Sequence, residues 1–250
     1  MIVLKRVDWL APSNVKAVQT KRQGGVSKGA FASLNLGAHV TDSPQNVTLN
    51  RTRLADQLAI PADSLRWLNQ THSTIVVEDP AAAVEADASF TRKSGVVCAV
   101  MTADCLPVLF CDEAGTQVAA AHCGWRGLAG GILEKTVHQF ASPGSLMAWL
   151  GPAIGPDHFE VGVDVVQAFT RLSKDLAGYF SPAQGTTRGV SKWMGDLYGI
   201  ARHLLTRQGV TQIFGGGDCT FCQSNEYFSF RRESVTGRQA SLIWLSETLT

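Results

Sequence analysis

A series of short apolar runs is the feature that most restricts how this chain can fold. The runs lie at residues 75–77, 96–101, 106–111, 117–121, 146–150, 212–214 and 241–245. Runs of this length, bounded by residues that favour turns, predict β-strands rather than helices. Several runs are apolar throughout, which predicts strands buried on both faces. The core should therefore be built largely from strands.

Four longer segments show apolar residues at helical spacing instead. They cover residues 46–58, 127–141, 164–172 and 196–207, and the first should end before Pro61, which cannot continue a helix. Residues 181–189 read as a polar connection. With 250 residues and 45% hydrophobic content, the chain can bury a large core, and we expect one domain over residues 1–250.

Charge and the first residues of the chain argue against several classes of protein. The net charge is +1 and no basic run exceeds two residues, so the electrostatic footprint of a nucleic-acid-binding protein is missing from the sequence. The first six residues include charged side chains and no long apolar stretch follows, which argues against a secretory signal and a membrane span. We therefore expect a cytoplasmic protein that acts on a small molecule. Its oligomeric state is not indicated.

Three residues suggest a metal site. His72, Cys105 and His122 each lie where an apolar run meets a turn, which is where functional groups are commonly presented. Two imidazoles, one thiolate and a water would complete a tetrahedron around zinc, and three protein ligands are typical of a catalytic zinc site. The alternative is two hydrogen-bonded structural histidines and a core cysteine, and the ligand spacing matches no compact zinc finger. Both interpretations stay open at this point.

Arginines near these residues are candidates for anion binding. Arg126 lies at the start of the predicted helix 127–141, whose free backbone N–H groups would also attract an anion such as phosphate. A solvated or ion-paired arginine is the alternative. Arg231 and Arg232 follow Tyr227-Phe-Ser-Phe230 and could bind phosphate or stack on a base, or could mark an exposed strand end.

The remaining cysteines and histidines carry weaker signals. Cys219 and Cys222 have the spacing of a zinc or redox motif, but the sequence contains no second such pair to complete a four-thiolate site. The other histidines fall in predicted loops or on polar helix faces, and we interpret them as solvated surface residues: His39, His138, His158 and His203.

Several motifs, ordered along almost the whole chain, resemble the YfiH-like family. They are Gln70-Thr-His72, Thr102-Ala-Asp-Cys105-Leu-Pro, His122-Cys-Gly-Trp-Arg-Gly, Gly151-Pro-Ala-Ile-Gly-Pro-Asp-His-Phe-Glu-Val, Phe228-Ser-Phe-Arg-Arg and Thr236-Gly-Arg. This family is also called the polyphenol oxidase (laccase-domain) or purine nucleoside phosphorylase family. The resemblance implies an α+β fold of packed mixed β-sheets flanked by helices, similar to the catalytic domain of cytotoxic necrotizing factor. It also implies zinc held by His72, Cys105 and His122.

The resemblance implies three activities. They are phosphorolysis of adenosine, inosine and methylthioadenosine, deamination of adenosine, and copper-dependent oxidation of phenols. Phosphorolysis requires an anion site and a group that helps the base depart. Arg126 and the N-terminus of the helix beside it are candidates for the first role, and zinc or a nearby acid, Asp104, for the second. Arg22, Asn35 and Arg232, within the matching motifs and loops, are further candidates for binding substrate or phosphate.

Copper is the less favoured metal. A multicopper oxidase needs several paired histidines, and this chain has six histidines and no His-X-His motif. Two histidines and one cysteine can nevertheless hold a single copper. Cys123 stands where the family usually has alanine, which would add a second thiol beside the metal.

Two alternatives from other classes remain. The first is a metal-free cysteine hydrolase or amidase acting on cell-wall precursors, with Cys105 as nucleophile and His122 as base. The second is a non-catalytic protein in which the same metal site is structural.

Overall fold

Three β-sheets form the framework of the computed structural model, which describes residues 1–81, 83–183 and 192–247. A five-stranded sheet has the order β1 (Leu4–Arg6), β2 (Val15–Thr20), β14 (Gln239–Leu245), β6 (Val97–Thr102), β3 (Leu65–Trp67). A six-stranded sheet has the order β13 (Gln212–Gly215), β9 (Leu146–Leu150), β7 (Leu106–Asp112), β8 (Val118–Cys123), β5 (Ala88–Thr91), β4 (Val76–Glu78). A small sheet joins β10 (Glu160–Val161), β12 (Trp193–Gly195) and β11 (Phe180–Pro182).

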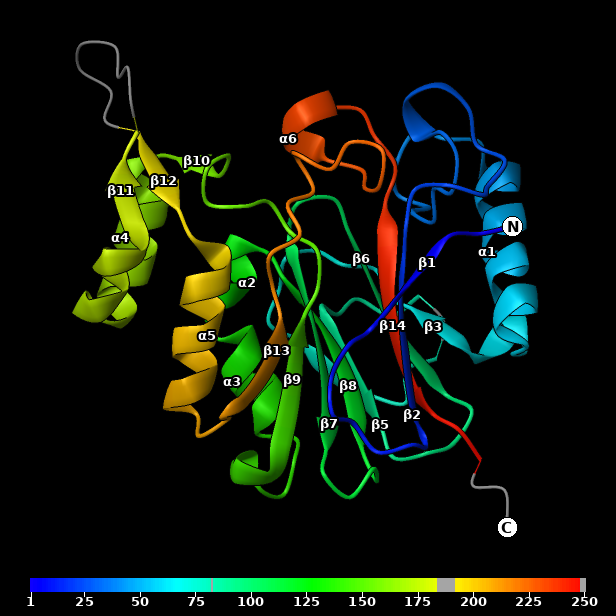
Figure 1. Cartoon of the computed structure of the whole chain (residues 1–250), viewed down its shortest axis with the longest axis horizontal. Coiled ribbons are helices and arrows are strands. Elements are labelled where there is room, and N and C mark those ends of the chain that lie inside the picture. The colour runs from blue at the N-terminus through cyan, green and yellow to red at the C-terminus, as the bar shows by residue number, and fades with distance from the viewer. Residues whose placement is uncertain (82, 184–191, 248–250) are drawn as a thin grey trace.

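The two large sheets are mixed, and the small sheet is antiparallel. Strands pair in parallel between β3 and β6, β4 and β5, and β9 and β13, and the other pairs are antiparallel. The two large sheets pack face to face through one apolar cluster, to which Val100 and Ile243 contribute from one sheet and Leu109 and Ala120 from the other. Helices cover the two outer faces (Figure 1). The predicted α+β fold of packed mixed sheets flanked by helices is therefore confirmed.

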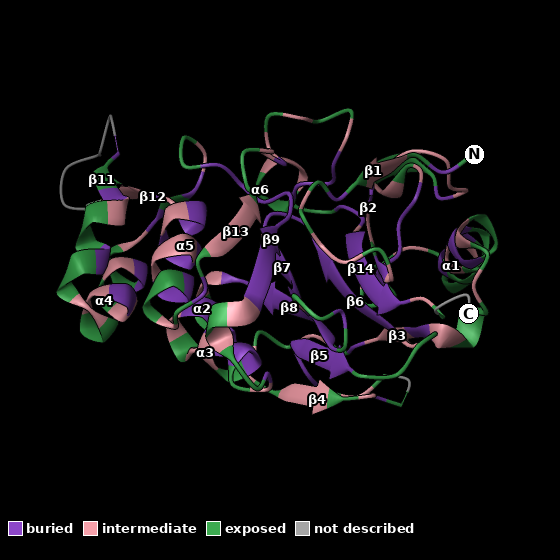
Figure 2. Cartoon of the chain, turned by 60° about the horizontal axis from the view of Figure 1, so that its bottom comes forward, coloured by how far each residue is buried: buried purple, intermediate pink, exposed green. Residues whose placement is uncertain are grey.

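The central strands are buried on both faces, as their apolar runs predict. Along β7, Leu106, Val108 and Phe110 contact the helical layer, whereas Leu109 and Cys111 contact the other sheet. This alternation is the period of two expected for a strand, in which successive side chains point to opposite faces. Figure 2 shows β6, β7, β8, β9 and β14 as buried elements at the centre of the molecule.

Three of the four predicted helices are present. They are α1 (Pro44–Leu58), which packs on the five-stranded sheet, and α4 (Val163–Leu172) and α5 (Leu197–Arg207), which lie on the opposite side of the molecule (Figure 1). The prediction of one continuous helix over residues 127–141 is wrong. Two short helices, α2 (Trp125–Gly130) and α3 (Ile132–Val137), meet at Gly131, whose φ of 89° is left-handed and ends the first helix.

Other elements are not signalled by the sequence. They include the helix α6 (Phe230–Glu233) and the strands β1, β2, β3, β5, β10 and β12. They also include the 3-10 helices at Gly29–Phe31, Ala62–Ser64, Pro143–Ser145 and Lys174–Tyr179. The connection expected at residues 181–189 begins within β11, and its residues 184–189 lie outside the described part of the chain. Among the described residues, no helix has the length and apolar character needed to cross a bilayer.

Candidate functional site

The three predicted metal ligands converge at one end of the large sheets. His72 lies in the connection between β3 and β4, Cys105 directly precedes β7, and His122 is near the end of β8. One ligand atom of each lies within 4.8 Å of those of the other two. Cys105 Sγ is 3.8 Å from His72 Nε2, and the two imidazole centroids are 4.9 Å apart. Two imidazoles and a thiolate are a donor set suited to zinc or a single copper ion.

A buried carboxylate that the sequence analysis missed holds both histidines in place. Asp87, just before β5, is fully buried, and its Oδ1 accepts hydrogen bonds from His122 Nδ1 at 2.7 Å and the backbone N–H of His72 at 3.1 Å. Its Oδ2 accepts from the backbone N–H of Ser73 at 2.6 Å. Because Nδ1 of His122 is occupied, Nε2 is its free ring nitrogen. A carboxylate that orients a histidine in this way is the usual support of a metal-binding imidazole.

Charge separation within this group favours a thiolate. Burial alone would raise the pKa of Cys105, but the neighbouring His122 and His72 outweigh it and lower that pKa to about 6. Burial alone would lower the pKa of His122, but Cys105 and Asp87 outweigh it and raise that pKa to about 9. The pKa of Asp87 is lowered, since hydrogen bonds from His122 and Ser73 outweigh its burial. The thiolate is the form of cysteine that binds metals and attacks carbonyl groups.

Two residues of the site have a left-handed backbone that is uncommon outside glycine. His72 has φ of 61° and Asp104 has φ of 89°. The Asp104 carboxylate accepts hydrogen bonds on both oxygens, from Thr220 Oγ1 and from the backbone N–H of Arg231, each at 2.6 Å. These bonds fix the turn that precedes Cys105. Asp104, predicted as a catalytic acid, therefore has the contacts of a positioning residue.

A cavity of about 440 Å³ opens beside the three ligands. Its wall is partly apolar, with contributions from Met101, Trp125, Ile154, Phe159, Leu197 and Phe230. Its cationic lining comprises Arg126, Arg231 and Arg238. His39 also lines the cavity, so it is not simply the surface residue that the sequence suggested, and burial and the nearby Arg238 lower its pKa, which favours the neutral imidazole. Apolar rings and guanidinium groups in one lining can accommodate both an aromatic ring and an anion.

Arg126 is the arginine best placed to receive an anion. Its guanidinium stacks over the Trp125 ring at 4.3 Å and has neither a hydrogen bond nor an ion pair within the described ranges. Arg231 and Arg238, by contrast, already donate from Nη1 to backbone carbonyls. The helix that begins beside Arg126 is only six residues long, so the strong helix terminus expected from a helix over residues 127–141 is not formed.

Three other predicted binding residues lie outside this cavity lining. Arg22 donates to the carbonyls of Ala32 and Ser224 and pairs with Glu233. Asn35 is fully buried and bonds to neighbouring loop residues, and Arg232 donates to the carbonyls of residues 220, 221 and 227. Their polar groups bond to neighbouring loop residues, and their role in binding substrate stays a prediction.

Cys123 also departs from its predicted place beside the metal. Successive residues of β8 point to opposite faces, so His122 faces the site while Cys123 packs in the apolar cluster under the helices. Burial raises the pKa of its thiol well above the ordinary range. The structure gives Cys123 the role of a core residue.

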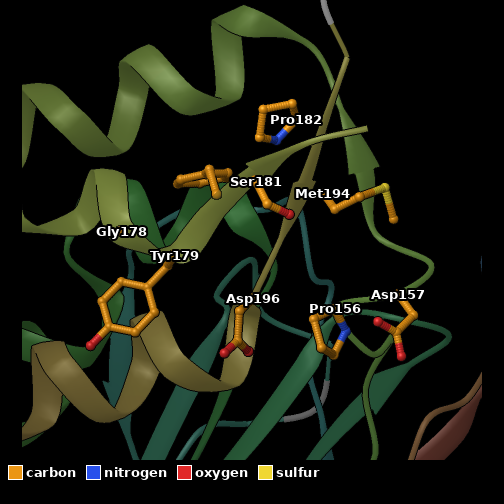
Figure 3. Close-up of a pocket in the computed structure, with 9 residues that line it drawn as sticks. Pro156, Asp157, Gly178, Tyr179, Ser181, Pro182, Met194 and Asp196 are labelled. Carbon is orange, nitrogen blue, oxygen red and sulfur yellow. The ribbon is translucent and has the colours of Figure 1, made fainter. Parts of the chain in front are cut away.

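A second cavity, of about 570 Å³, lies beside the small sheet. Figure 3 shows its lining, which includes Asp157, Tyr179, Met194 and Asp196. Asp196 accepts a hydrogen bond from the backbone N–H of Gly199 and so caps α5. Since no histidine or cysteine is found among the described lining residues of this cavity, we take the cavity beside Cys105 as the candidate active site.

Gly124→Ala should disrupt the arrangement of the ligands. A β-carbon at position 124 would lie 2.9 Å from His72 Cδ2 and 3.1 Å from Cys105 Sγ, which is closer than such contacts normally come. We expect metal affinity, measured by competition with a chelator, to fall about 10-fold or more. Gly144→Ala is the control, because a β-carbon there meets nothing within 4 Å. Equal affinity of the two variants would contradict the placement of His72 and Cys105.

Comparison with known proteins gives matches over nearly the whole chain. A family model described as multi-copper polyphenol oxidoreductase laccase matches residues 16–246. A purine nucleoside phosphorylase of Pseudomonas aeruginosa is 50% identical over 242 residues, which cover 96% of this chain and 97% of that protein. The purine nucleoside phosphorylase YfiH of Escherichia coli is 48% identical over 241 residues, covering 95% of this chain and 96% of that protein.

Solved structures agree with these matches. The crystal structure of a Neisseria meningitidis protein superposes with a TM-score of 0.91 and 49% sequence identity, over 98% of this chain and 99% of that one. The crystal structure of YlmD from Geobacillus stearothermophilus superposes with a TM-score of 0.84 and 31% identity, over 98% and 99% of the two chains. The matched region contains all three candidate metal ligands.

Proposed function

Because this chain belongs to the multi-copper polyphenol oxidoreductase laccase family, whose members include proteins named purine nucleoside phosphorylase, we propose that it is a metal-dependent purine nucleoside phosphorylase. Its substrates would be phosphate and a purine nucleoside such as adenosine, inosine or methylthioadenosine. The observation that carries the proposal is a cavity with the ligand set His72, Cys105 and His122, a partly apolar wall, and an Arg126 that has no ion pair with any described residue.

Different residues of the cavity bind the phosphate and the base during phosphorolysis. A phosphate oxygen forms a bond to the anomeric carbon of ribose while the bond from that carbon to the purine nitrogen breaks, and the base leaves with the electron pair and takes up a proton. Arg126 binds and orients the phosphate, since a guanidinium offers two parallel donors to an anion. The aromatic rings of Phe159 and Phe230 pack against the base.

Zinc is the metal that we propose for His72, Cys105 and His122. A bound Zn²⁺ would act as a Lewis acid that stabilises negative charge and lowers the pKa of water. Water attack on the purine carbon that carries the amino group would release ammonia, so we include adenosine deamination as a side activity. Asp87 orients His122, and the low pKa of Cys105 keeps the thiolate available as a ligand. Copper at the same three residues is the alternative, in keeping with the description of the family.

The direct test is the reaction of inosine with phosphate. Protein loaded with zinc should form ribose 1-phosphate and hypoxanthine in equal amounts, and should form neither product when phosphate is omitted. A zinc-loaded protein that yields no ribose 1-phosphate would rule out phosphorolysis. The same protein loaded with copper and given a phenol tests the oxidase alternative.

Arg126→Ala should raise the KM for phosphate more than it lowers kcat. Loss of a hydrogen bond to a charged group is worth about 1.5–3 kcal/mol, so we expect the KM for phosphate to rise about 10- to 100-fold. The KM for inosine should change little. Arg92→Ala is the control, because Arg92 also lies over an aromatic ring but is paired with Glu78 away from the cavity. An unchanged KM for phosphate would remove Arg126 from the phosphate site.

A cysteine hydrolase is the second candidate, favoured by the chain of contacts from Cys105 through His122 to Asp87. A nucleophile, a base and a group that orients the base are the parts of a cysteine-dependent hydrolase. In metal-free protein, Cys105 should be alkylated by iodoacetamide near pH 7, and the rate should fall as the pH drops below about 6, where its thiolate takes up a proton.

Mass mapping of the alkylated sites checks this expectation. Buried Cys98, whose pKa is raised to about 12 by burial, should stay unmodified in the folded protein and serves as the control. A half-maximal rate at the pH of an ordinary cysteine, about 8.5, would contradict the charge separation in the site. Amidase activity lost in parallel with alkylation, in protein that holds no metal, would favour the hydrolase.

A further inference from the structure

A second group of metal-binding side chains lies outside the site described above. His158 belongs to the loop between β9 and β10, and Cys219 and Cys222 belong to the segment that follows β13. One ligand atom of each lies within 4.8 Å of those of the other two. His158 Nδ1 is 4.0 Å from Cys219 Sγ and 3.5 Å from Cys222 Sγ. Segments that are far apart in the sequence therefore bring two thiols and one imidazole together.

The backbone around this group holds the three side chains in place. The two segments form a parallel bridge between Ala153 and Cys219, and the backbone N–H of Thr220 donates to the carbonyl of Ala153 at 2.9 Å. The backbone N–H of Gly155 donates to Cys219 Sγ at 3.2 Å. The His158 ring stacks on Phe221, with centroids 4.3 Å apart and planes inclined by 24°. The donors are therefore arranged by packing and hydrogen bonds before any ion binds.

We propose that His158, Cys219 and Cys222 bind one Zn²⁺ ion, separate from the ion proposed at Cys105. Two thiolates and an imidazole are donors that zinc prefers, and the Cys-X-X-Cys spacing lets two thiolates reach one ion. Cys222 is exposed, and Cys219 and His158 are partly exposed, so a bound ion would be open to solvent and would take water as a further ligand. When the ion binds, both thiols release their protons to solvent.

An ion at this place would also stabilise one wall of the cavity beside Cys105. Thr220, next to Cys219, donates to Asp104, and the carbonyl of His158 accepts from Arg231 Nη1 at 3.1 Å. Both Asp104 and Arg231 line the cavity beside Cys105. The second ion would therefore fasten together the two segments that support one wall of the candidate active site.

Metal content provides the test. The full chain, purified under reducing conditions and loaded with zinc, should hold two equivalents by elemental mass spectrometry. Cys222→Ser and His158→Ala should each lose one equivalent, and so should Cys105→Ala, whereas the two losses should add in Cys105→Ala/Cys222→Ser. Cys111→Ala, which removes a buried thiol from the contact between the sheets, should keep both equivalents. Because Cys222 is exposed, its substitution should not disturb folding, which circular dichroism would check.

Cobalt distinguishes the sites by their thiolates. Replacement of zinc by Co²⁺ should give a thiolate-to-cobalt charge-transfer band that loses its larger part in Cys219→Ser/Cys222→Ser and its smaller part in Cys105→Ala. The proposal would be overturned if Cys222→Ser and His158→Ala each had the same zinc content and the same cobalt spectrum as the unaltered chain. So would a Cys219–Cys222 disulfide that persists under reducing conditions and forms equally well in His158→Ala. Nucleoside turnover is not a readout here, so the second ion is judged independently of the proposed phosphorylase.

Discussion

Cys105→Ala should lose the metal bound beside His72 and His122 and lower kcat/KM for inosine phosphorolysis on the order of 1000-fold, a barrier increase of about 4 kcal/mol. The substitution removes the thiolate of this ligand set and leaves two imidazoles, which hold zinc much less tightly. Cys105 is partly exposed, so the loss should not come from unfolding. Metal content, ribose 1-phosphate formation and the unfolding temperature should be measured on the same preparation.

Cys111→Ala is the matched control for this change. It removes one thiol from β7, at the apolar contact between the sheets rather than at the cavity, and it should retain the metal and the activity while losing some stability. Phosphorolysis that survives in Cys105→Ala, with the metal gone, would place the reaction elsewhere. Phosphorolysis that survives with the metal still bound would remove Cys105 from the ligands.

Asp87→Asn should weaken both the metal site and the fold. The amide keeps the size of the side chain but replaces one carboxylate oxygen by an NH2 group. That group cannot accept the hydrogen bonds that His72, Ser73 and His122 donate to the carboxylate in the unaltered protein. Loss of a carboxylate that orients a ligating histidine costs about 10- to 100-fold in metal affinity. Burial of unpaired donors should lower the free energy of unfolding by about 2–3 kcal/mol. Chelator competition measures the first effect, and denaturant unfolding of the metal-free protein measures the second.

Asp112→Asn separates these two effects. Asp112 accepts hydrogen bonds from the backbone N–H groups of Thr116 and Gln117 at the opposite end of β7. Its substitution should lower stability without changing metal affinity. If Asp87→Asn binds metal as tightly as the unaltered protein, then the contact between Asp87 and His122 does not support a metal ligand.

Much of the framework could be predicted because its signals are local. The runs at residues 106–111 and 146–150 coincide with buried strands, and the spacing of apolar residues identifies α1, α4 and α5. The three candidate ligands could be selected because Cys105 and His122 lie next to the ends of predicted strands, and His72 shortly precedes the apolar run at residues 75–77. The single helix predicted over residues 127–141 failed because Gly131 adopts a left-handed backbone, which a pattern of apolar residues does not reveal.

The parts that could not be predicted depend on contacts between distant segments. Asp87 is an ordinary acidic residue in the sequence, and only the pairing of β5 with β8 brings it to His122. Likewise, His158 looks like a surface residue until the loop after β9 meets Cys219. The bonds of Arg232 could not be predicted for the same reason, because the carbonyls that accept from its guanidinium come from loops that form only in the folded chain.

The position of β14 sets the order in which the molecule can be assembled. This strand lies between β2 and β6, so residues 239–245 join the two parts of the five-stranded sheet. During synthesis, β2 and β6 leave the ribosome before their common neighbour β14. The strand edges that pair with β14 therefore stay unpaired until it has emerged. Arg238, directly before β14, reaches the cavity at the same stage. The sheet and the cavity are therefore completed only after residue 245 has emerged, and a chain terminated before residue 239 would leave the ribosome with two open strand edges.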